Sequence, residues 1–275
     1  MPTNDTGRGT INGPQPRENR VLFDGVAEQY DRARPTYPDA LFDDIVALSG
    51  VPDGGRVLEV GCGTGQATRP MAERGYRITA VELGPNLAAV ARRNLERYGV
   101  DVQVGAFEEW PLPAEPFDLV MSVSAFHWLD AALALPKIAA ALRPGGAIAV
   151  TSGGHVAGGD TQFFHDAQEC YERWMPGTPP GLRLKAADGY PLEAPAIEAC
   201  GLFEPAQMRR HVWLREFTTQ SYIDEIGTYS GNLDLSEENR AGLHACLARM
   251  IDEQWAGRIT KAYMTDLAVA RLRER

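Results

Sequence analysis

The feature that most constrains the fold is a glycine-rich turn at residues 61–65, which directly follows a short, mostly apolar run at 56–60 (RVLEV). Three glycines in this turn let a ligand approach the backbone closely, and the amide groups that open the next helix can face that ligand. A strand, a tight glycine turn and a helix in this order predict an α/β domain with a binding site at the turn. The turn alone does not say which nucleotide-like ligand binds.

Strands and helices are expected to alternate after this turn. The predicted strands are 56–60, 77–81, 102–104, 117–123 and 147–151, and the predicted helices between them are 66–74, 86–97 and 131–142. Further helices are expected at 161–174, 192–200, 219–229 and 236–256, and further strands at 207–217 and 258–268. Alternation at this spacing favours a parallel sheet that is buried on both faces. We therefore predict an α/β fold: a doubly wound, Rossmann-like, mostly parallel seven-stranded sheet with a helical cap inserted after strand five.

The length of 275 residues permits one elaborated domain or two small ones. We expect one sheet domain made of 21–152 and 192–275, with a helical elaboration at about 218–256 and a cap insertion at 153–191. Residues 1–20 are polar and rich in Gly, Pro and Arg, so we expect a flexible tail there.

The overall charge argues against two classes of partner. The chain has 27 basic and 37 acidic residues, a net charge of −10, which disfavours nucleic acid and anionic membranes. No apolar run reaches the length of about 18 residues that a transmembrane helix needs, and no secretory leader is apparent, so a cytoplasmic location is expected. Four cysteines are widely spaced: Cys62, Cys170, Cys200 and Cys246. We expect them to be small buried hydrophobes in a reducing compartment, without a disulfide framework or a zinc site.

The spacing of the turn departs from the usual dinucleotide fingerprint, which needs a glycine at the sixth position, where this chain has Gln66. Glu59 lies in the strand before the turn, and a carboxylate there suits a cationic ligand group better than a pyrophosphate. Glu82 ends the second strand, 21 residues after Gly61. An acidic side chain at that position can accept hydrogen bonds from both hydroxyls of a ribose.

At these residues the sequence resembles the class I S-adenosylmethionine-dependent methyltransferases. The resemblance extends over about 23–151, and its strongest positions are Glu59, Gly61, Gly63, Gly65 and Glu82. Further matches are 105–111, Phe117 with Asp118, and LRPGG at 142–146. The segments 30–38 (YDRARPTYP) and 125–129 (AFHWL) are similar to the small-molecule branch that includes trans-aconitate methyltransferase-like enzymes.

The resemblance implies S-adenosyl-L-methionine as cofactor. It implies that the backbone of 61–65 contacts the methionine half, that Glu59 orients its ammonium, and that Glu82, followed by Leu83, holds the ribose. Ser122 is implied to line the methionine side. Tyr30 and Arg34 are implied to close over the cofactor, with Arg34 paired to its carboxylate; a helix-packing tyrosine and a surface arginine are the competing interpretations.

The adenine is implied to lie beside Ala106, Phe107 and Glu108. The branch often has Asp where this chain has Ala106. We therefore expect Glu108 or backbone groups to accept from the adenine amine and Phe107 to pack on the ring.

The predicted function is methyl transfer to a small molecule, with oxygen favoured over nitrogen as the acceptor atom. A carboxylate acceptor needs no base, whereas a hydroxyl or ammonium does, and His127 is the candidate base or else a structural histidine. Four residues are candidate substrate contacts, with packing as the competing role: Trp128, His155, Trp174 and Tyr229. Neither a metal site nor an oligomeric state is indicated. The alternatives are an N-methyltransferase of a natural-product amine and a non-catalytic cofactor-binding protein. The residues at 124–127 (SAFH) lack the motifs of nucleic-acid methyltransferases, in agreement with the charge.

Overall fold

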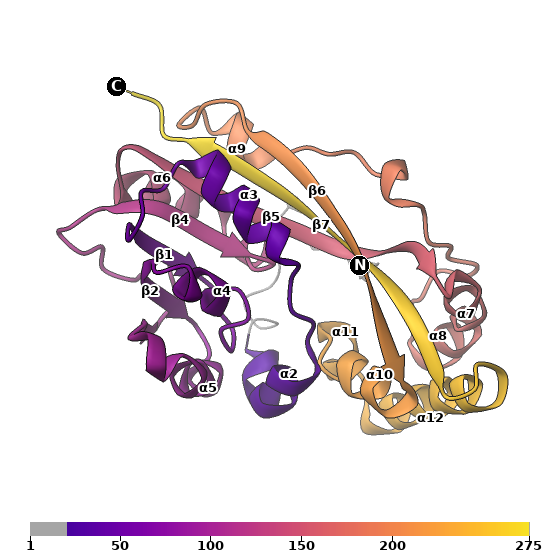
Figure 1. Cartoon of the computed structure of the whole chain (residues 1–275). Helices are drawn as coiled ribbons and strands as arrows, with labels where there is room; N and C mark the ends of the chain where they lie inside the picture. Colours follow the sequence, from indigo (N-terminus) through magenta and orange to yellow (C-terminus); the bar gives the residue numbers. More distant parts are fainter. Residues whose placement is uncertain (1–20, 275) are drawn as a thin grey trace.

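The computed structural model describes residues 21–274, so the expected flexible tail at 1–20 lies outside the described residues. Within that range the sheet has seven strands in the order β3-β2-β1-β4-β5-β7-β6 (Figure 1). The strands are β1 (Arg56–Val60), β2 (Arg77–Glu82), β3 (Asp101–Val104), β4 (Phe117–Val123), β5 (Leu142–Gly159), β6 (Gln207–Thr218) and β7 (Arg258–Arg271). Only β7 runs antiparallel to its neighbours β5 and β6. The predicted fold class is confirmed.

Helices cover both faces of the sheet, as its buried parallel strands require. An apolar core on one face joins α3 (Asp39–Ser49) and α4 (Thr68–Glu73) to the sheet. The core on the other face joins α6 (Ala131–Ala141) and α9 (Pro195–Ala199) to it. The helix α5 (Pro85–Leu95) follows β2 and packs beside β3. These layers leave the carboxyl ends of β1, β2 and β4 on a common edge, where ligands bind in open α/β sheets.

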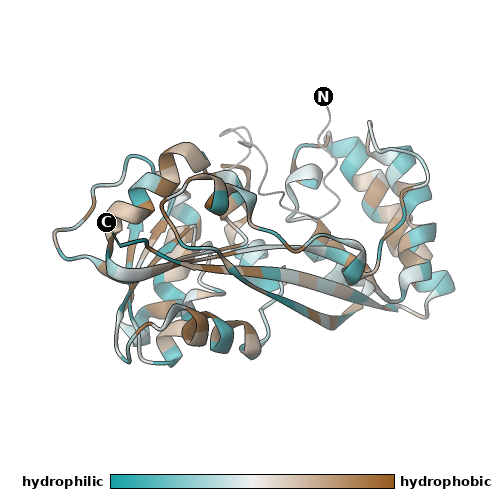
Figure 2. Cartoon of the chain, turned by 90° about the horizontal axis from the view of Figure 1, so that it is seen from above, coloured by the Kyte–Doolittle hydropathy of each residue, from teal (hydrophilic) through white to brown (hydrophobic). Residues whose placement is uncertain are grey.

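The strands β5, β6 and β7 extend well beyond that edge and carry a group of helices at their far end (Figure 1). The strand predicted at 147–151 continues to Gly159 because β7 pairs with it, with His155 opposite Tyr263, Val156 opposite Ala262 and a register shift between Val156 and Gly159. The glycine-rich run after Thr151 was therefore wrongly expected to lie outside the sheet. Figure 2 shows these strands bridging the sheet domain and the distal helices.

The distal helices, which we call the cap, are α7 (Thr161–Asp166), α8 (Gln168–Trp174), α10 (Thr219–Ile226), α11 (Ser230–Leu233) and α12 (Glu237–Gln254). They share an apolar core that includes Phe163, Leu243 and Leu247, each fully buried. The hydroxyl of Ser236 accepts from the backbone N–H of Asn239, so Ser236 caps the amino end of α12.

A disulfide joins Cys170 in α8 to Cys246 in α12, 76 residues apart in the sequence. The expectation that these two cysteines are free small hydrophobes is wrong. The physical reason is tertiary: packing of α8 on α12 brings the two Cα atoms to 5.8 Å, within the range that a disulfide needs. Cys62 and Cys200 are free thiols. In residues 21–274, no helix combines the length and apolar character required to span a membrane.

Candidate functional site

The turn after β1 is held in a conformation that favours glycine. Gly61, Gly63 and Gly65 have φ of 76°, 58° and 97°, in the left-handed region where a side chain is strained. The Gly61 N–H donates to the carbonyl of Val81 at 2.8 Å, which fixes the turn beside β2. A Cβ at Gly61 would lie 2.6 Å from the Cβ of Ala125, in the turn after β4. The three predicted glycines therefore lie together at the carboxyl edge of the sheet.

Glu82, at the end of β2, is 7% exposed and faces this turn. Its Oε2 accepts from the N–H of Gly63 at 2.8 Å, and its Oε1 accepts from the N–H of Gly84 at 2.9 Å. Burial raises the pKa of Glu82, against the effect of these backbone donors. Each carboxylate oxygen can accept more than one hydrogen bond, so both retain the capacity for a ligand hydroxyl.

Glu59, in β1, is 1% exposed, and its Oε2 has no hydrogen-bond partner among residues 21–274. Burial raises the pKa of Glu59 to about 7; the Thr68 side chain opposes this shift, and the charge of Glu82 adds to it. A buried carboxylate oxygen without a partner is costly unless a ligand completes it. This oxygen fits the ammonium of a methionine group, so the residues present suit S-adenosylmethionine.

The N-terminal elements η1 (Leu22–Val26) and α2 (Ala27–Ala33) cover the turn. Asp24 Oδ1 accepts from the N–H groups of Asn86 at 2.7 Å and Leu87 at 3.0 Å, which caps α5 and pins the segment there. A Cβ at Gly63 would lie 3.6 Å from the ring of Tyr30. The structure thus places Tyr30 directly over the glycine turn.

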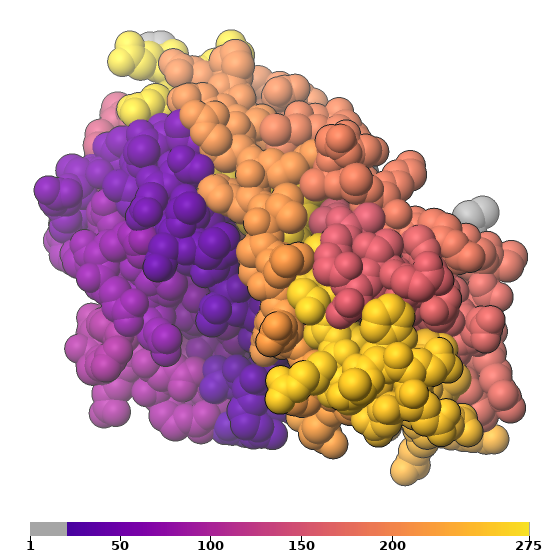
Figure 3. Space-filling model, turned by 45° about the vertical axis from the view of Figure 1, so that its right-hand side comes forward, coloured from indigo at the N-terminus to yellow at the C-terminus, as the bar shows by residue number. Residues whose placement is uncertain are grey.

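Arg34 ties α2 to the cap. Its Nε donates to the hydroxyl of Thr228 at 2.9 Å and its Nη2 to the carbonyl of Thr228 at 2.8 Å. Its guanidinium lies 4.9 Å from the ring centroid of Tyr30 and 4.6 Å from that of Tyr229. In Figure 3 the indigo N-terminal elements lie against the orange segment that contains β6 and α10. The pairing of Arg34 with a cofactor carboxylate stays a prediction.

The segment predicted to flank adenine follows β3. Phe107 is 3% exposed and its ring packs with Trp110 in the sheet core, with centroids 6.5 Å apart. Ala106 is half-buried, and its carbonyl accepts from the N–H of Trp110 at 2.9 Å. Glu108 Oε1 accepts from the N–H of Asp130 at 3.5 Å. The adenine contacts stay predictions, as does that of Leu83, which lies between Glu82 and the Gly84 that donates to it.

The end of β4 brings further predicted residues to the same edge. The Ser122 hydroxyl donates to the carbonyl of Val60 at 2.9 Å, beside the start of the glycine turn. His127 and Trp128 lie in the short helix η3 (Phe126–Trp128), with ring centroids 4.9 Å apart. Trp128 packs edge-to-face on Phe23 at 5.5 Å, so the covering segment contacts the turn after β4.

The other predicted substrate contacts lie in or beside the cap. Trp174 packs on α12, where a Cβ at Gly242 would lie 2.3 Å from its ring. His155 packs against Phe164 at 4.1 Å, and burial, helped by the charge of Lys261, holds the pKa of His155 well below its usual range. Tyr229 belongs to a buried polar cluster that the sequence did not predict.

This cluster, which we call the cap cluster, consists of Glu225, Tyr229, Lys261 and Tyr263. Lys261 Nζ donates to the Tyr229 hydroxyl at 2.6 Å, and Tyr229 donates to Glu225 Oε1 at 2.6 Å. Tyr263 donates to the same carboxylate oxygen. One signal was available in the sequence: Lys261 is a basic residue inside a mostly apolar strand. The structure buries it at 3% exposure.

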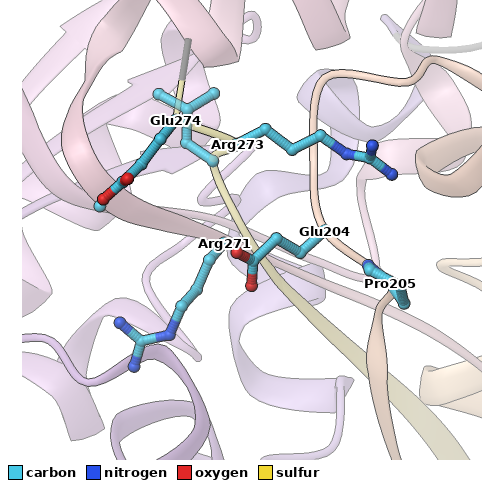
Figure 4. Close-up of a pocket in the computed structure, with 7 residues that line it drawn as sticks. Glu204, Pro205, Arg271, Arg273 and Glu274 are labelled. Carbon is cyan, nitrogen blue, oxygen red and sulfur yellow. The ribbon is translucent and has the colours of Figure 1, made fainter.

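One open hollow lies elsewhere. It measures about 630 Å³ and is lined by Gly145, Glu204, Pro205, Arg271, Leu272, Arg273 and Glu274 (Figure 4). Arg271 pairs with Ala147 at the amino end of β5, so this open hollow is on the edge opposite the glycine turn. Among residues 21–274 no group of three or more His, Cys, Asp or Glu side chains is arranged to hold a metal ion.

Comparison with known proteins identifies the family. A family model described as a methyltransferase domain matches residues 58–150. An uncharacterised methyltransferase of Anoxybacillus flavithermus is 30% identical over 165 residues, which cover 57% of this chain and 72% of that protein. The chain belongs to the class I S-adenosylmethionine-dependent methyltransferases. S-adenosylmethionine is the methyl donor of this family.

Two further comparisons are with a relative that has a named activity and with a solved structure. The malonyl-[acyl-carrier protein] O-methyltransferase of Serratia marcescens is 32% identical over 146 residues, 53% of this chain and 55% of that protein. The chain spans about half the length of the first curated relatives it matches. A protein of Anaeromyxobacter dehalogenans, solved as a candidate type II methyltransferase, shares the fold with a TM-score of 0.59 at 22% identity, covering 86% of this chain and 97% of that one.

Proposed function

We propose that this chain transfers the methyl group of S-adenosyl-L-methionine to a small molecule, with oxygen rather than nitrogen as the acceptor. One observation carries the proposal: two buried carboxylates, Glu59 and Glu82, flank a left-handed glycine turn at the carboxyl edge of the sheet. Glu59 has an oxygen without a partner, which suits a cationic group, and Glu82 lies where a ribose binds in such folds.

The residues divide the binding of the cofactor among them. Glu82 would accept from the ribose hydroxyls, Glu59 would hold the ammonium, and the backbone of 61–65 would contact the methionine half. Tyr30 would cover the turn and exclude water. When bound, S-adenosylmethionine supplies a methyl group already activated on a sulfonium, so the chain has mainly to orient the acceptor in a dry site.

The choice of oxygen rests on chemistry and on one relative. A carboxylate is ionised at neutral pH and attacks without a base, whereas a hydroxyl needs a base such as His127. The Serratia relative is named an O-methyltransferase. The segments 30–38 and 125–129 support the trans-aconitate methyltransferase-like branch as the finer assignment. A small-molecule partner, no nucleic acid and a cytoplasmic location complete the proposal.

Transfer of a labelled methyl group tests the proposal. The protein is incubated with methyl-labelled S-adenosylmethionine and separate pools of small acids, alcohols and amines, and methylated products are identified by mass spectrometry. We expect methyl esters or ethers from the wild type and none from Glu82→Ala, because that change removes the carboxylate that orders the turn.

Glu96→Ala is the matched control, since Glu96 is an exposed carboxylate outside the site, and it should behave as the wild type does. Methylated amines without methylated acids or alcohols would favour the N-methyltransferase alternative. Cofactor binding without any product would favour the non-catalytic one.

A further inference from the structure

The cap cluster buries ionisable groups in a place that a purely structural role does not explain. Glu225 is fully buried and Lys261 is 3% exposed, with Lys261 Nζ 3.5 Å from Glu225 Oε1. Buried ion pairs recover their desolvation cost only when their remaining polar atoms are also satisfied. Here they are not: Glu225 Oε2 and the neighbouring His155 Nε2 are buried without a hydrogen-bond partner among residues 21–274.

Basic side chains outnumber acidic ones around this cluster. Arg34 and Lys261 both lie over the ring of Tyr229, at 4.6 Å and 5.0 Å from its centroid. Arg215, whose Nη1 donates to the carbonyl of Ala33 at 3.0 Å, also acts electrostatically on Lys261. Three basic groups therefore lie in or beside the cluster, whose buried carboxylate is Glu225, in a chain whose net charge is −10.

Two of these basic groups keep hydrogen-bond donors for a ligand. The hydrogen bonds of Arg34 use Nε and Nη2, both to Thr228, and leave Nη1 without an acceptor in residues 21–274. Lys261 has three N–H donors, of which Tyr229 accepts one and Glu225 a long second one. Spare donors on the buried Lys261 and the half-buried Arg34 suit an anionic acceptor.

The cap cluster is also close to the proposed cofactor site. Lys261 and Tyr263 lie in the part of β7 that pairs with β5 beyond residue 151, past the carboxyl edge of the sheet. Arg34 contacts the rings of both Tyr229 and Tyr30, and Tyr30 lies over Gly63. The side chains of Arg34 and then Tyr30 thus connect the cap cluster to the glycine turn.

We propose that the cap cluster is the substrate subsite and that Lys261 and Arg34 bind a carboxylate group of the methyl acceptor. The inference rests on the proposed function and names its substrate class. The two oxygens of a carboxylate match the spare donors of Lys261 and Arg34, and a hydroxyl elsewhere on the acceptor would donate to the open Glu225 Oε2. A hollow of about 50 Å³ borders Arg215 and Ala33 on the seam between α2 and α10.

Calorimetric titration of the full chain saturated with S-adenosylhomocysteine tests the subsite. The probes are malonate, succinate and benzoate, each compared with its uncharged amide: malonamide, succinamide and benzamide. We expect the acids to bind and the amides not to. Lys261→Met should weaken acid binding roughly 30-fold or more, because it removes one partner of a buried charged contact. Lys185→Met, at an exposed lysine, is the matched control and should bind acids as the wild type does.

Two controls distinguish loss of acid binding from loss of folding. Unchanged affinity of Lys261→Met for S-adenosylhomocysteine shows that the variant folds, and Lys261→Arg, which keeps the charge, should keep most of the acid binding. The subsite is wrong if amides bind as well as acids, or if Lys261→Met binds acids like the wild type. Binding of S-adenosylhomocysteine without any preference for acids overturns the subsite alone. Lys261-dependent acid binding without S-adenosylhomocysteine binding overturns the proposed cofactor and leaves the subsite standing.

Discussion

Replacement of Gly61 by Ala measures how tightly the glycine turn is packed against the turn after β4. Gly61 has φ 76°, and an added Cβ would lie 2.6 Å from the Cβ of Ala125. The left-handed backbone costs a residue with a Cβ roughly 1–2 kcal/mol. Overpacking of this kind adds roughly 1–3 kcal/mol. Because both costs apply, Gly61→Ala should lower the free energy of unfolding by roughly 2–5 kcal/mol.

Gly54→Ala separates the two costs. Gly54 also has a left-handed backbone, φ 66°, but an added Cβ there would meet nothing within 4 Å. That variant should lose only the backbone cost, and the difference between the two variants in urea unfolding is the cost of the contact. Gly61→Ala should also bind S-adenosylhomocysteine more weakly, because Ala125 must move, while Gly54→Ala should not. Equal destabilisation of the two variants would refute the close packing.

Three further changes test individual residues. Burial raises the pKa of Glu59 from 4.5 to about 7, so between these pH values the folded chain keeps a proton that the unfolded chain loses. The free energy of unfolding should therefore fall by about 3 kcal/mol as pH rises from 4.5 to 7. Urea unfolding of Glu59→Gln across the same pH range should lack that fall. Cys170→Ser removes the disulfide and should lower the free energy of unfolding by about 2–5 kcal/mol. Thiol titration of the denatured, unreduced wild type should find two free thiols. Four free thiols would show that the disulfide does not form. His127→Gln should slow turnover of a hydroxyl acceptor about 100-fold or more with cofactor affinity unchanged, and unchanged turnover would leave His127 a structural role.

Local patterns predicted the part of the molecule where contacts are local. The strands through β4 and the glycine turn follow from short apolar runs and turn residues, because each βαβ unit folds back on its own neighbours. Gly61 and Glu82 were predicted as a pair from their separation alone, and the structure brings them to the same turn.

Contacts between distant segments explain what the sequence did not reveal. The glycine-rich run after Thr151 becomes part of β5 because β7, about a hundred residues later, supplies its hydrogen bonds. Cys170 meets Cys246 because α8 packs on α12. The partners of Lys261 come from a helix and a loop that carry no motif, so the only signal was a lysine inside a mostly apolar strand.

The sequence also did not predict that Arg34, near the N-terminus, forms hydrogen bonds with the cap. The motif at 30–38 suggested a group that closes over the cofactor, and Tyr30 does cover the glycine turn. Arg34, four residues later, instead donates two hydrogen bonds to Thr228. No pattern in the sequence marks Thr228 as its acceptor.

Binding of S-adenosylhomocysteine, measured by calorimetry, tests the central claim most directly. We predict a single site in the wild type, a large loss of affinity in Glu82→Ala, unchanged affinity in Glu96→Ala, and no heat with a nicotinamide dinucleotide. Absence of S-adenosylhomocysteine binding to the folded wild type, or equal binding to Glu82→Ala, would contradict the assignment of the cofactor to the glycine turn.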